Sequence, residues 1–177
     1  MCSSDLLALR DGRMGSVPLM GGAAGLGLGL ALARPGRQVL VVDGDASLLM
    51  ELGGLVTVGT QAPSRYLHIL ANNGTQFTGG SNLLVPGHQQ VNFCAIALAA
   101  GYRHAKRIDS LVEWTAQLPA LMAAQGPGFV ELVITPAPPR FGPAAAQSEV
   151  PDLQFSRMGE EAVALSAWLA ASTTCAP

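Results

Sequence analysis

The sequence predicts a three-layer α/β fold, in which a mostly parallel, doubly wound sheet lies between helices. Strand-like apolar runs alternate along the chain with segments of helical character. Two of these runs, Gln38–Asp43 and Tyr66–Ala71, are largely apolar on both faces, as is typical of strands covered by helices on both sides. We therefore expect the 177 residues to form a single domain, and a hydrophobic content of 49% excludes intrinsic disorder.

In the first half of the chain, helix-breaking residues and the spacing of apolar residues predict the helices and strands. Ala and Leu recur at helical spacing until Arg34-Pro35-Gly36, which stops a helix, and Ser47 is expected to be the N-cap of the next one. The expected elements are an irregular or truncated start over 1–12, a helix over Gly21–Ala33, a strand over Gln38–Asp43, a helix over Ser47–Val58 and a strand over Tyr66–Ala71.

The second half follows the same alternation. A Gly/Pro-rich composition predicts a loop, a Pro-rich segment predicts extended chain, and amphipathic spacing predicts the last helix. The expected elements are a loop over Thr78–Gly87, a helix over Val91–Ala100, a strand over Tyr102–Ile108, a helix from Asp109 or Ser110 to about Ala124, a strand over Phe129–Thr135, an extended segment over 136–151 and a helix within 156–172.

Composition excludes several classes of partner. The formal net charge is −2, with no basic stripe, so we expect neither nucleic acid nor an anionic membrane surface as a ligand. The apolar stretch Gly21–Ala33 is short of the roughly 20 residues that span a bilayer. Three widely separated cysteines (Cys2, Cys94 and Cys175) predict no disulfide framework, and with no visible signal peptide they indicate a reducing cytoplasm.

Polar residues that suit a cation and a phosphate follow two of the predicted strands. Asp45 comes just after the first strand, and Asn73 and Thr75 come just after the second. A carboxylate, a carboxamide and a backbone carbonyl form an oxygen cage of the kind that Mg²⁺ prefers. The amides of Ala46 and Ser47 open the predicted helix, where phosphate groups bind. These residues therefore suit a diphosphate bridged by Mg²⁺.

The spacing of these groups resembles the signature of thiamine-diphosphate-dependent enzymes, in which Gly-Asp-Gly is followed about thirty residues later by Asn-Asn. Gly44-Asp45 and Asn72-Asn73 match it, and Ala46 stands where the family usually has glycine. The resemblance implies that the Asp45 and Asn73 side chains and the Thr75 carbonyl bind Mg²⁺. It implies a cofactor-binding set of Pro18, Met20, Gly44, Asp45, Ala46, Ser47, Asn73, Thr75, Gln76 and Phe77.

The segment before the first strand resembles the same family. Met20 falls where these enzymes place a bulky apolar residue that props the cofactor into its bent shape. The Met20 N–H and the Pro18 carbonyl would contact the pyrimidine ring. The small residues over Gly21–Gly29 would let a helix pack closely beneath cofactor and sheet.

Further stretches are similar to phosphonopyruvate and sulfopyruvate decarboxylases, and the resemblance covers about residues 13–136. It implies decarboxylation of a 2-oxoacid such as 3-phosphonopyruvate or 3-sulfopyruvate. In this family the pyrimidine-binding domain of a partner chain supplies the glutamate that protonates the cofactor. We therefore expect an α-type partner subunit or a homo-oligomer, unless the chain is the carboxyl-terminal part of a longer enzyme.

Other interpretations stay open. The chain could belong to a carboligase of the acetolactate synthase or benzaldehyde lyase type, or bind the cofactor without activity of its own. Asp45 and Asn73 could be a helix cap and a turn residue. His88 could reach the substrate as a catalytic residue, or it could be solvated in its loop.

Overall fold

The computed structural model describes residues 20–78, 81–136 and 151–171. The chain divides into two compact units, Met20–Pro139 and a second made of Met1–Leu19 with Arg140–Pro177. The first unit contains the sheet and all the described candidate site residues. Of the second unit, the described part is a single helix, α7 (Pro151–Ala171).

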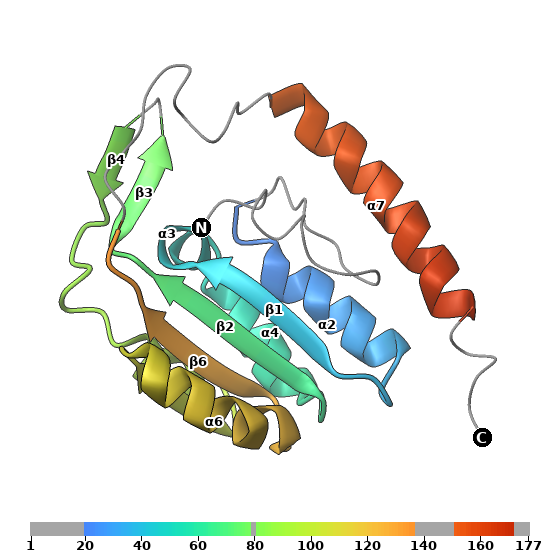
Figure 1. Ribbon diagram of the computed structural model, residues 1–177, viewed down its shortest axis with the longest axis horizontal. Coiled ribbons are helices and arrows are strands. Elements are labelled where there is room, and N and C mark those ends of the chain that lie inside the picture. Colours follow the sequence, from blue (N-terminus) through green and yellow to red (C-terminus); the bar gives the residue numbers. More distant parts are fainter. Residues whose placement is uncertain (1–19, 79–80, 137–150, 172–177) are drawn as a thin grey trace. The chain divides into compact units, whose positions relative to one another are not determined.

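A parallel sheet forms the centre of the first unit (Figure 1). Its order is β1-β2-β6-β5, and every neighbouring pair is parallel. The strands are β1 (Val39–Gly44), β2 (Tyr66–Asn72), β5 (His104–Ile108) and β6 (Gly128–Val133). The expected doubly wound α/β fold is confirmed, and the strand predictions are correct to within two residues at each end.

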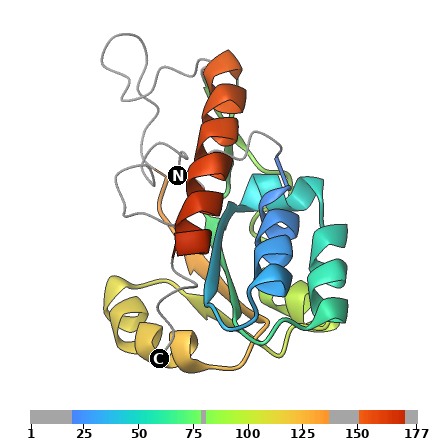
Figure 2. The same cartoon turned by 90° about the vertical axis from the view of Figure 1, so that its right-hand side faces the viewer.

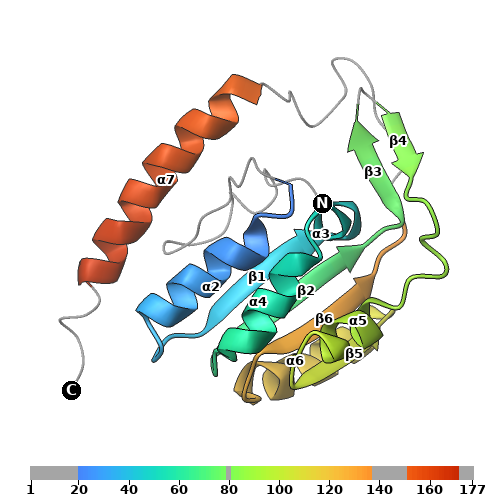
Figure 3. The same cartoon turned by 180° about the vertical axis from the view of Figure 1, so that it is seen from behind.

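Helices cover both faces of this sheet. They are α2 (Ala23–Ala33), α3 (Asp45–Met50), α4 (Gly53–Gln61), α5 (Phe93–Ala99) and α6 (Leu111–Ala123). Figure 3 shows α2, α4 and α5 on one face, and Figure 2 shows α6 on the opposite side of the sheet. From β1 the chain moves across the sheet through β2 to β5, and it then returns to β6, which lies between β2 and β5. Because crossovers between parallel strands are right-handed, the helix of the returning connection, α6, lies on the other face.

Two hydrophobic clusters hold the layers together, one on each face. On the α2–α4–α5 face, Leu55 and Phe93 pack against Tyr66 and Phe129 of the sheet. On the α6 face, Leu121 packs against Leu67, Ile69, Ile108 and Val130. Because β2 contributes to both clusters, every residue of this strand is buried.

One predicted helix, Ser47–Val58, is wrong, because the segment forms two helices, α3 and α4, with a break at Glu51–Leu52. The glycine pair Gly53-Gly54 opens the second helix, and glycine weakens a continuous helix by roughly 1 kcal/mol per residue. Ser47 is not the N-cap. Helix α3 begins at Asp45 with Gly44 as N-cap, whereas Ser110 does cap α6 by accepting from the Glu113 N–H.

The predicted loop Thr78–Gly87 is also partly wrong. Residues Thr75–Thr78 form β3 and Ser81–Leu84 form β4, which pair as an antiparallel hairpin beside the carboxyl end of the main sheet (Figure 1). The sequence places Gly79-Gly80 between these strands, and two glycines between strand-like runs are a hairpin signal. These two glycines lie outside the described residues.

The last helix begins earlier than expected, at Pro151, since the fixed φ of proline is compatible with a first helical turn. Residues 137–150 of the predicted extended segment, and residues 1–12, lie outside the described residues. Among the helices that the structure describes, none has the length and apolar character needed to cross a membrane.

Close packing of α2 against the sheet depends on Gly27. A Cβ built at Gly27 would overlap the Val41 side chain and lie 3.3 Å from the Tyr66 ring. The Tyr66 hydroxyl donates to the Ala24 carbonyl at 3.0 Å, which fixes the same helix. At Gly29, by contrast, no described atom lies within 4 Å of such a Cβ. The expected close packing is therefore confirmed for Gly27 and is not required at Gly29.

Gly27→Ala and Gly29→Ala are predicted to change stability in opposite directions. Both gain about 0.5–1 kcal/mol of helix propensity, but Gly27→Ala also crowds Val41, at a cost of about 1–3 kcal/mol. Urea unfolding of the two variants measures the difference. Equal stabilisation by both substitutions would contradict the packing argument.

Candidate functional site

Asp45 lies at the carboxyl end of β1 and is 2% exposed. It is the first residue of α3, directly after the strand. Parallel pairing of β1 with β2 puts Gly44 opposite Ala71, so the residues after each strand emerge side by side. Asp45 Oδ2 accepts a hydrogen bond from the Gly74 N–H at 3.0 Å. The two predicted motifs therefore meet in space, as expected for ligand sites in open α/β sheets.

Burial makes the charge on Asp45 costly. Desolvation raises the pKa of this carboxyl above its usual range, although several backbone hydrogen bonds oppose the shift. None of the three ion pairs among the described residues involves Asp45. A buried carboxylate without a cationic side chain beside it is the electrostatic setting that a bound cation would neutralise.

Asn73 closes a tight turn after β2. Its Oδ1 accepts from the Thr75 N–H at 2.9 Å and from the Thr75 hydroxyl at 3.2 Å. This is the turn role that the sequence left open, and the hydroxyl would have to release Oδ1 before that oxygen could bind a cation. Asp45 and the loop that contains Asn73 are hydrogen-bonded neighbours, but the structure holds the Asn73 oxygen in its own loop.

Gly74 joins these two residues, and glycine is required there. Its φ is +66°, in the left-handed region, and a Cβ would lie 2.8 Å from the His88 ring. His88 therefore lies against the site loop. Its Nδ1 is 3.1 Å from the Val85 carbonyl oxygen, and the Val85 N–H donates to Gly74, so the segment after β4 is fastened to the same loop.

The Met20 segment is joined to α3, the helix that begins at Asp45. The Gly21 N–H donates to the Ser47 hydroxyl at 2.8 Å, which joins the start of α2 to α3. Met20 is 44% exposed, in agreement with a side chain that would contact a ligand instead of the core. Ser47 is expected to bind the diphosphate through its amide, and its side chain contacts the Met20 segment.

The other residues of the predicted cofactor-binding set lie partly within and partly outside the described residues. Gly44 has an ordinary extended conformation, and beyond its chain neighbours no described atom lies within 4 Å of a Cβ built on it, so nothing in this part of the chain requires a glycine there. Ala46 lies in α3, and Gln76 and Phe77 lie in β3, directly after the site loop. Pro18 and the Phe77 side chain lie outside the described residues.

A contact between two polar side chains beneath the loop was not anticipated from the sequence, although one of the two residues, Asn72, belongs to the Asn-Asn motif. The Asn72 side chain donates to Glu131 Oε1 at 2.8 Å, and its Oδ1 accepts from the Gly74 N–H at 3.2 Å. Glu131 is 3% exposed within β6. A single carboxylate within the otherwise apolar run Phe129–Val133 was the available signal, because buried charges persist only with partners.

The donor set fits a small, hard cation. In the part of the chain that the structure describes, no cluster of three or more His, Cys, Asp or Glu side chains could hold a metal. That excludes a zinc-type centre among these residues. It leaves one carboxylate with amide and carbonyl oxygens, the set that Mg²⁺ uses when phosphate and water complete its shell.

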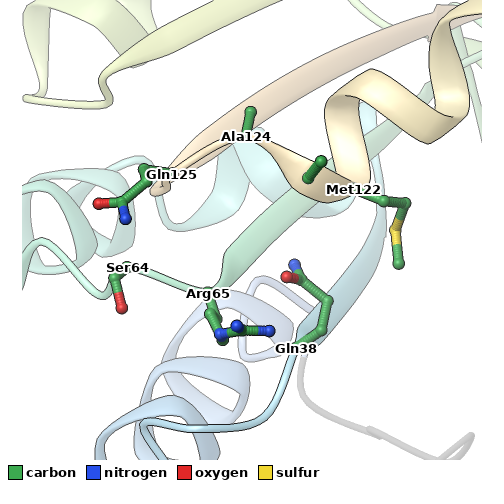
Figure 4. A pocket seen from close by; sticks show the side chains of 7 residues that line it. Gln38, Ser64, Arg65, Met122, Ala124 and Gln125 are labelled. Atoms are coloured by element: carbon green, nitrogen blue, oxygen red, sulfur yellow. The ribbon is translucent and has the colours of Figure 1, made fainter.

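A cavity of about 320 Å³ lies at the opposite end of the sheet (Figure 4). Gln38 and Arg65 line it just before β1 and β2, and Met122 lines it from the end of α6. Because ligands of open α/β sheets bind beyond the carboxyl ends of the strands, this cavity at the amino ends is not the candidate site.

Comparison with known proteins agrees with the geometry. Residues 11–132 match the family described as thiamine pyrophosphate enzyme, C-terminal TPP binding domain. The chain is 43% identical over 128 residues to a phosphonopyruvate decarboxylase of Streptomyces viridochromogenes, which covers 72% of this chain but 31% of that protein. It thus spans about a third of the length of this relative.

A shorter relative matches over more of its own length. The chain is 34% identical over 139 residues to the sulfopyruvate decarboxylase subunit beta of Methanothermobacter thermautotrophicus, covering 76% of this chain and 69% of that subunit. An X-ray structure described as that of a thiamin diphosphate-dependent enzyme from Mycobacterium smegmatis superposes with a TM-score of 0.57 at 20% identity. That match covers 67% of this chain and 22% of the other, and it supports the fold.

Asp45→Asn is predicted to stabilise the metal-free chain at pH 7. Because the folded-state pKa of Asp45 is raised, the wild type holds an unfavourable buried charge above that pKa, and asparagine does not. The gain should shrink as the pH falls through the raised pKa, where the wild-type carboxyl protonates. Urea unfolding across pH 4–7 measures it, with the exposed Asp109→Asn as control. A loss of stability at pH 7 would show that the carboxylate is not strained.

Proposed function

The chain belongs to the thiamine pyrophosphate enzymes, as their C-terminal TPP-binding domain, and on that premise we propose that it is the cofactor- and Mg²⁺-binding half of a 2-oxoacid decarboxylase. Thiamine pyrophosphate and thiamine diphosphate are the same compound. The observation that carries the proposal is the buried Asp45 carboxylate, hydrogen-bonded to the loop that follows Asn73.

The residues of this chain would divide the binding task. The Asp45 carboxylate, the Asn73 amide oxygen and the Thr75 carbonyl would hold Mg²⁺, and the amides of Ala46 and Ser47 would hold the diphosphate. The hydrogen bond from Gly21 to Ser47 ties Met20 to the same place, which supports its role beneath the cofactor. When bound, thiamine diphosphate supplies the electron sink that lets a 2-oxoacid lose CO₂.

The substrate class rests on the named relatives. A phosphonopyruvate decarboxylase and a sulfopyruvate decarboxylase subunit both match this chain above 30% identity. Their names share a pyruvate that carries an anionic group on its third carbon, so 3-phosphonopyruvate or 3-sulfopyruvate is our first choice. His88, packed against the site loop, is the side chain of this unit that we propose to face the substrate.

A second chain is part of the proposal. A relative of similar extent is named as a beta subunit, which supports a separate partner that carries the pyrimidine-binding domain. A homo-oligomer, or a longer protein that contains this domain, would meet the same need. A cytoplasmic location remains a prediction from the cysteine content.

Calorimetry tests the cofactor claim. We predict that the wild-type chain binds thiamine diphosphate only when Mg²⁺ is present, and that Asp45→Ala weakens this binding more than about 100-fold, because outer-shell changes alone cost 10–100-fold. Asp109→Ala, at an exposed aspartate after β5, which β2 and β6 separate from β1, is the matched control and should bind as the wild type does. Equal affinity of the Asp45→Ala and wild-type chains would contradict the metal role.

Release of CO₂ from a panel of 2-oxoacids tests the reaction. We predict turnover of 3-phosphonopyruvate or 3-sulfopyruvate in preference to unsubstituted pyruvate, and only when a pyrimidine-domain partner is added. Full turnover by the chain alone would contradict the two-chain proposal. Coupled carbon–carbon products would identify a carboligase, and cofactor binding without turnover under every condition would leave a binding domain alone.

A further inference from the structure

Glu131 is a buried carboxylate on β6, one of the two inner strands of the sheet. It lies opposite Leu70 of β2 and Arg107 of β5, and is 3% exposed. A carboxylate in such a place is destabilising unless hydrogen-bond donors surround it. The identity of those donors indicates what the residue does.

Among the described residues, three side chains face Glu131. The Asn72 amide donates to Oε1 at 2.8 Å, the Arg107 Nε lies 3.6 Å from the same oxygen, and the Cys94 thiol donates to Oε2 at 3.7 Å. Burial, and then the Glu131 charge, raise the pKa of Cys94 to about 11, so the thiol remains a protonated donor at neutral pH. The Arg107 side chain is 65% exposed, which leaves Asn72 as the short, buried contact.

The contact with Glu131 fixes the orientation of the Asn72 amide. A carboxylate accepts hydrogen bonds and does not donate them, so the NH₂ group of Asn72 must face Glu131. Its Oδ1 must then face the opposite way, where it accepts from the Gly74 N–H at 3.2 Å. The same N–H donates to Asp45 Oδ2 at 3.0 Å. A continuous set of hydrogen bonds therefore joins Glu131 to Asp45 without direct contact between them.

We propose that Glu131 is a positioning residue for the cation site and acts through the Asn72 amide. It keeps Asn72 Oδ1 on the Gly74 N–H, which holds the loop from Asn73 to Thr75 at a fixed place beside Asp45. The assignment rests on the proposed function for its metal, but the hydrogen-bonded set is a property of the metal-free chain.

Glu131→Gln removes the fixed orientation while keeping the shape of the side chain. A glutamine amide can either donate to or accept from Asn72, so Asn72 is no longer forced toward Gly74. We predict a shifted ¹H–¹⁵N resonance and faster hydrogen exchange for the Gly74 amide in the metal-free chain. Calorimetry should show about tenfold weaker Mg²⁺ binding in the presence of thiamine diphosphate.

Arg107→Gln is the matched control, because it removes a partner of the same carboxylate without touching Asn72. It should leave the Gly74 amide and Mg²⁺ affinity unchanged. Asn72→Ala breaks the same set of hydrogen bonds from the other side. It should show the altered Gly74 amide and the weaker Mg²⁺ binding predicted for Glu131→Gln, so the proposal can still be tested if Glu131→Gln fails to fold. The double variant should be no worse than either single one, since both act through one contact.

The outcomes separate this inference from the proposed function. An unchanged Gly74 amide in Glu131→Gln, or losses of affinity that multiply in the double variant, would overturn the positioning role. If the wild-type chain binds no Mg²⁺ with thiamine diphosphate, the proposed function fails. The Gly74 amide of the metal-free chain then still decides whether Glu131 orders the loop.

Discussion

The hydrogen bond from the Gly74 N–H to Asp45 is the interaction on which the candidate site depends. It joins the end of β1 to the loop after β2 and places a carboxylate where water has little access. Such a carboxylate raises the free energy of the metal-free fold, as the raised pKa of Asp45 indicates. The left-handed conformation of Gly74 and the His88 ring packed against it keep that N–H directed at Asp45.

The parallel sheet makes this contact possible. Parallel strands need a crossover between them, and α3 and α4 supply it, so two motifs far apart in sequence end at one edge of the sheet. Close packing of α2 over β1 through Gly27 brings Gly21 near enough to donate to Ser47. Within the stretch Gly21–Gly29, the glycines at Gly21 and Gly27 thus serve specific contacts, whereas Gly25 and Gly29 have open space beside them among the described residues.

Local patterns in the sequence predicted the strands, most helices and the meeting of Asp45 with the Asn73 loop, because buried parallel strands are recognisable from composition alone. The break between α3 and α4 was missed because helical spacing continues through Glu51–Leu52, and the low propensity of Gly53-Gly54 outweighs it. The link from Asn72 to Glu131 could not be predicted, since it joins residues 59 positions apart in sequence and depends on the register of their strands. Ser47 was misassigned as a cap because its true partner, Gly21, precedes the strand.

Among the described residues no ion pair involves the buried Asp45 carboxylate, so this part of the chain is better suited to binding a cation than to stability in isolation. Any ligand that binds the folded chain alone stabilises it by RT ln(1 + [L]/Kd), roughly 2.7 kcal/mol when the ligand concentration is 100 times Kd. A cation at Asp45 would add the charge partner that the described residues lack. The buried carboxylate that destabilises the metal-free chain would then stabilise the cation-bound chain. The network through Asn72 and Glu131 then keeps the loop in place before the cation arrives, which reduces the ordering that binding would otherwise require.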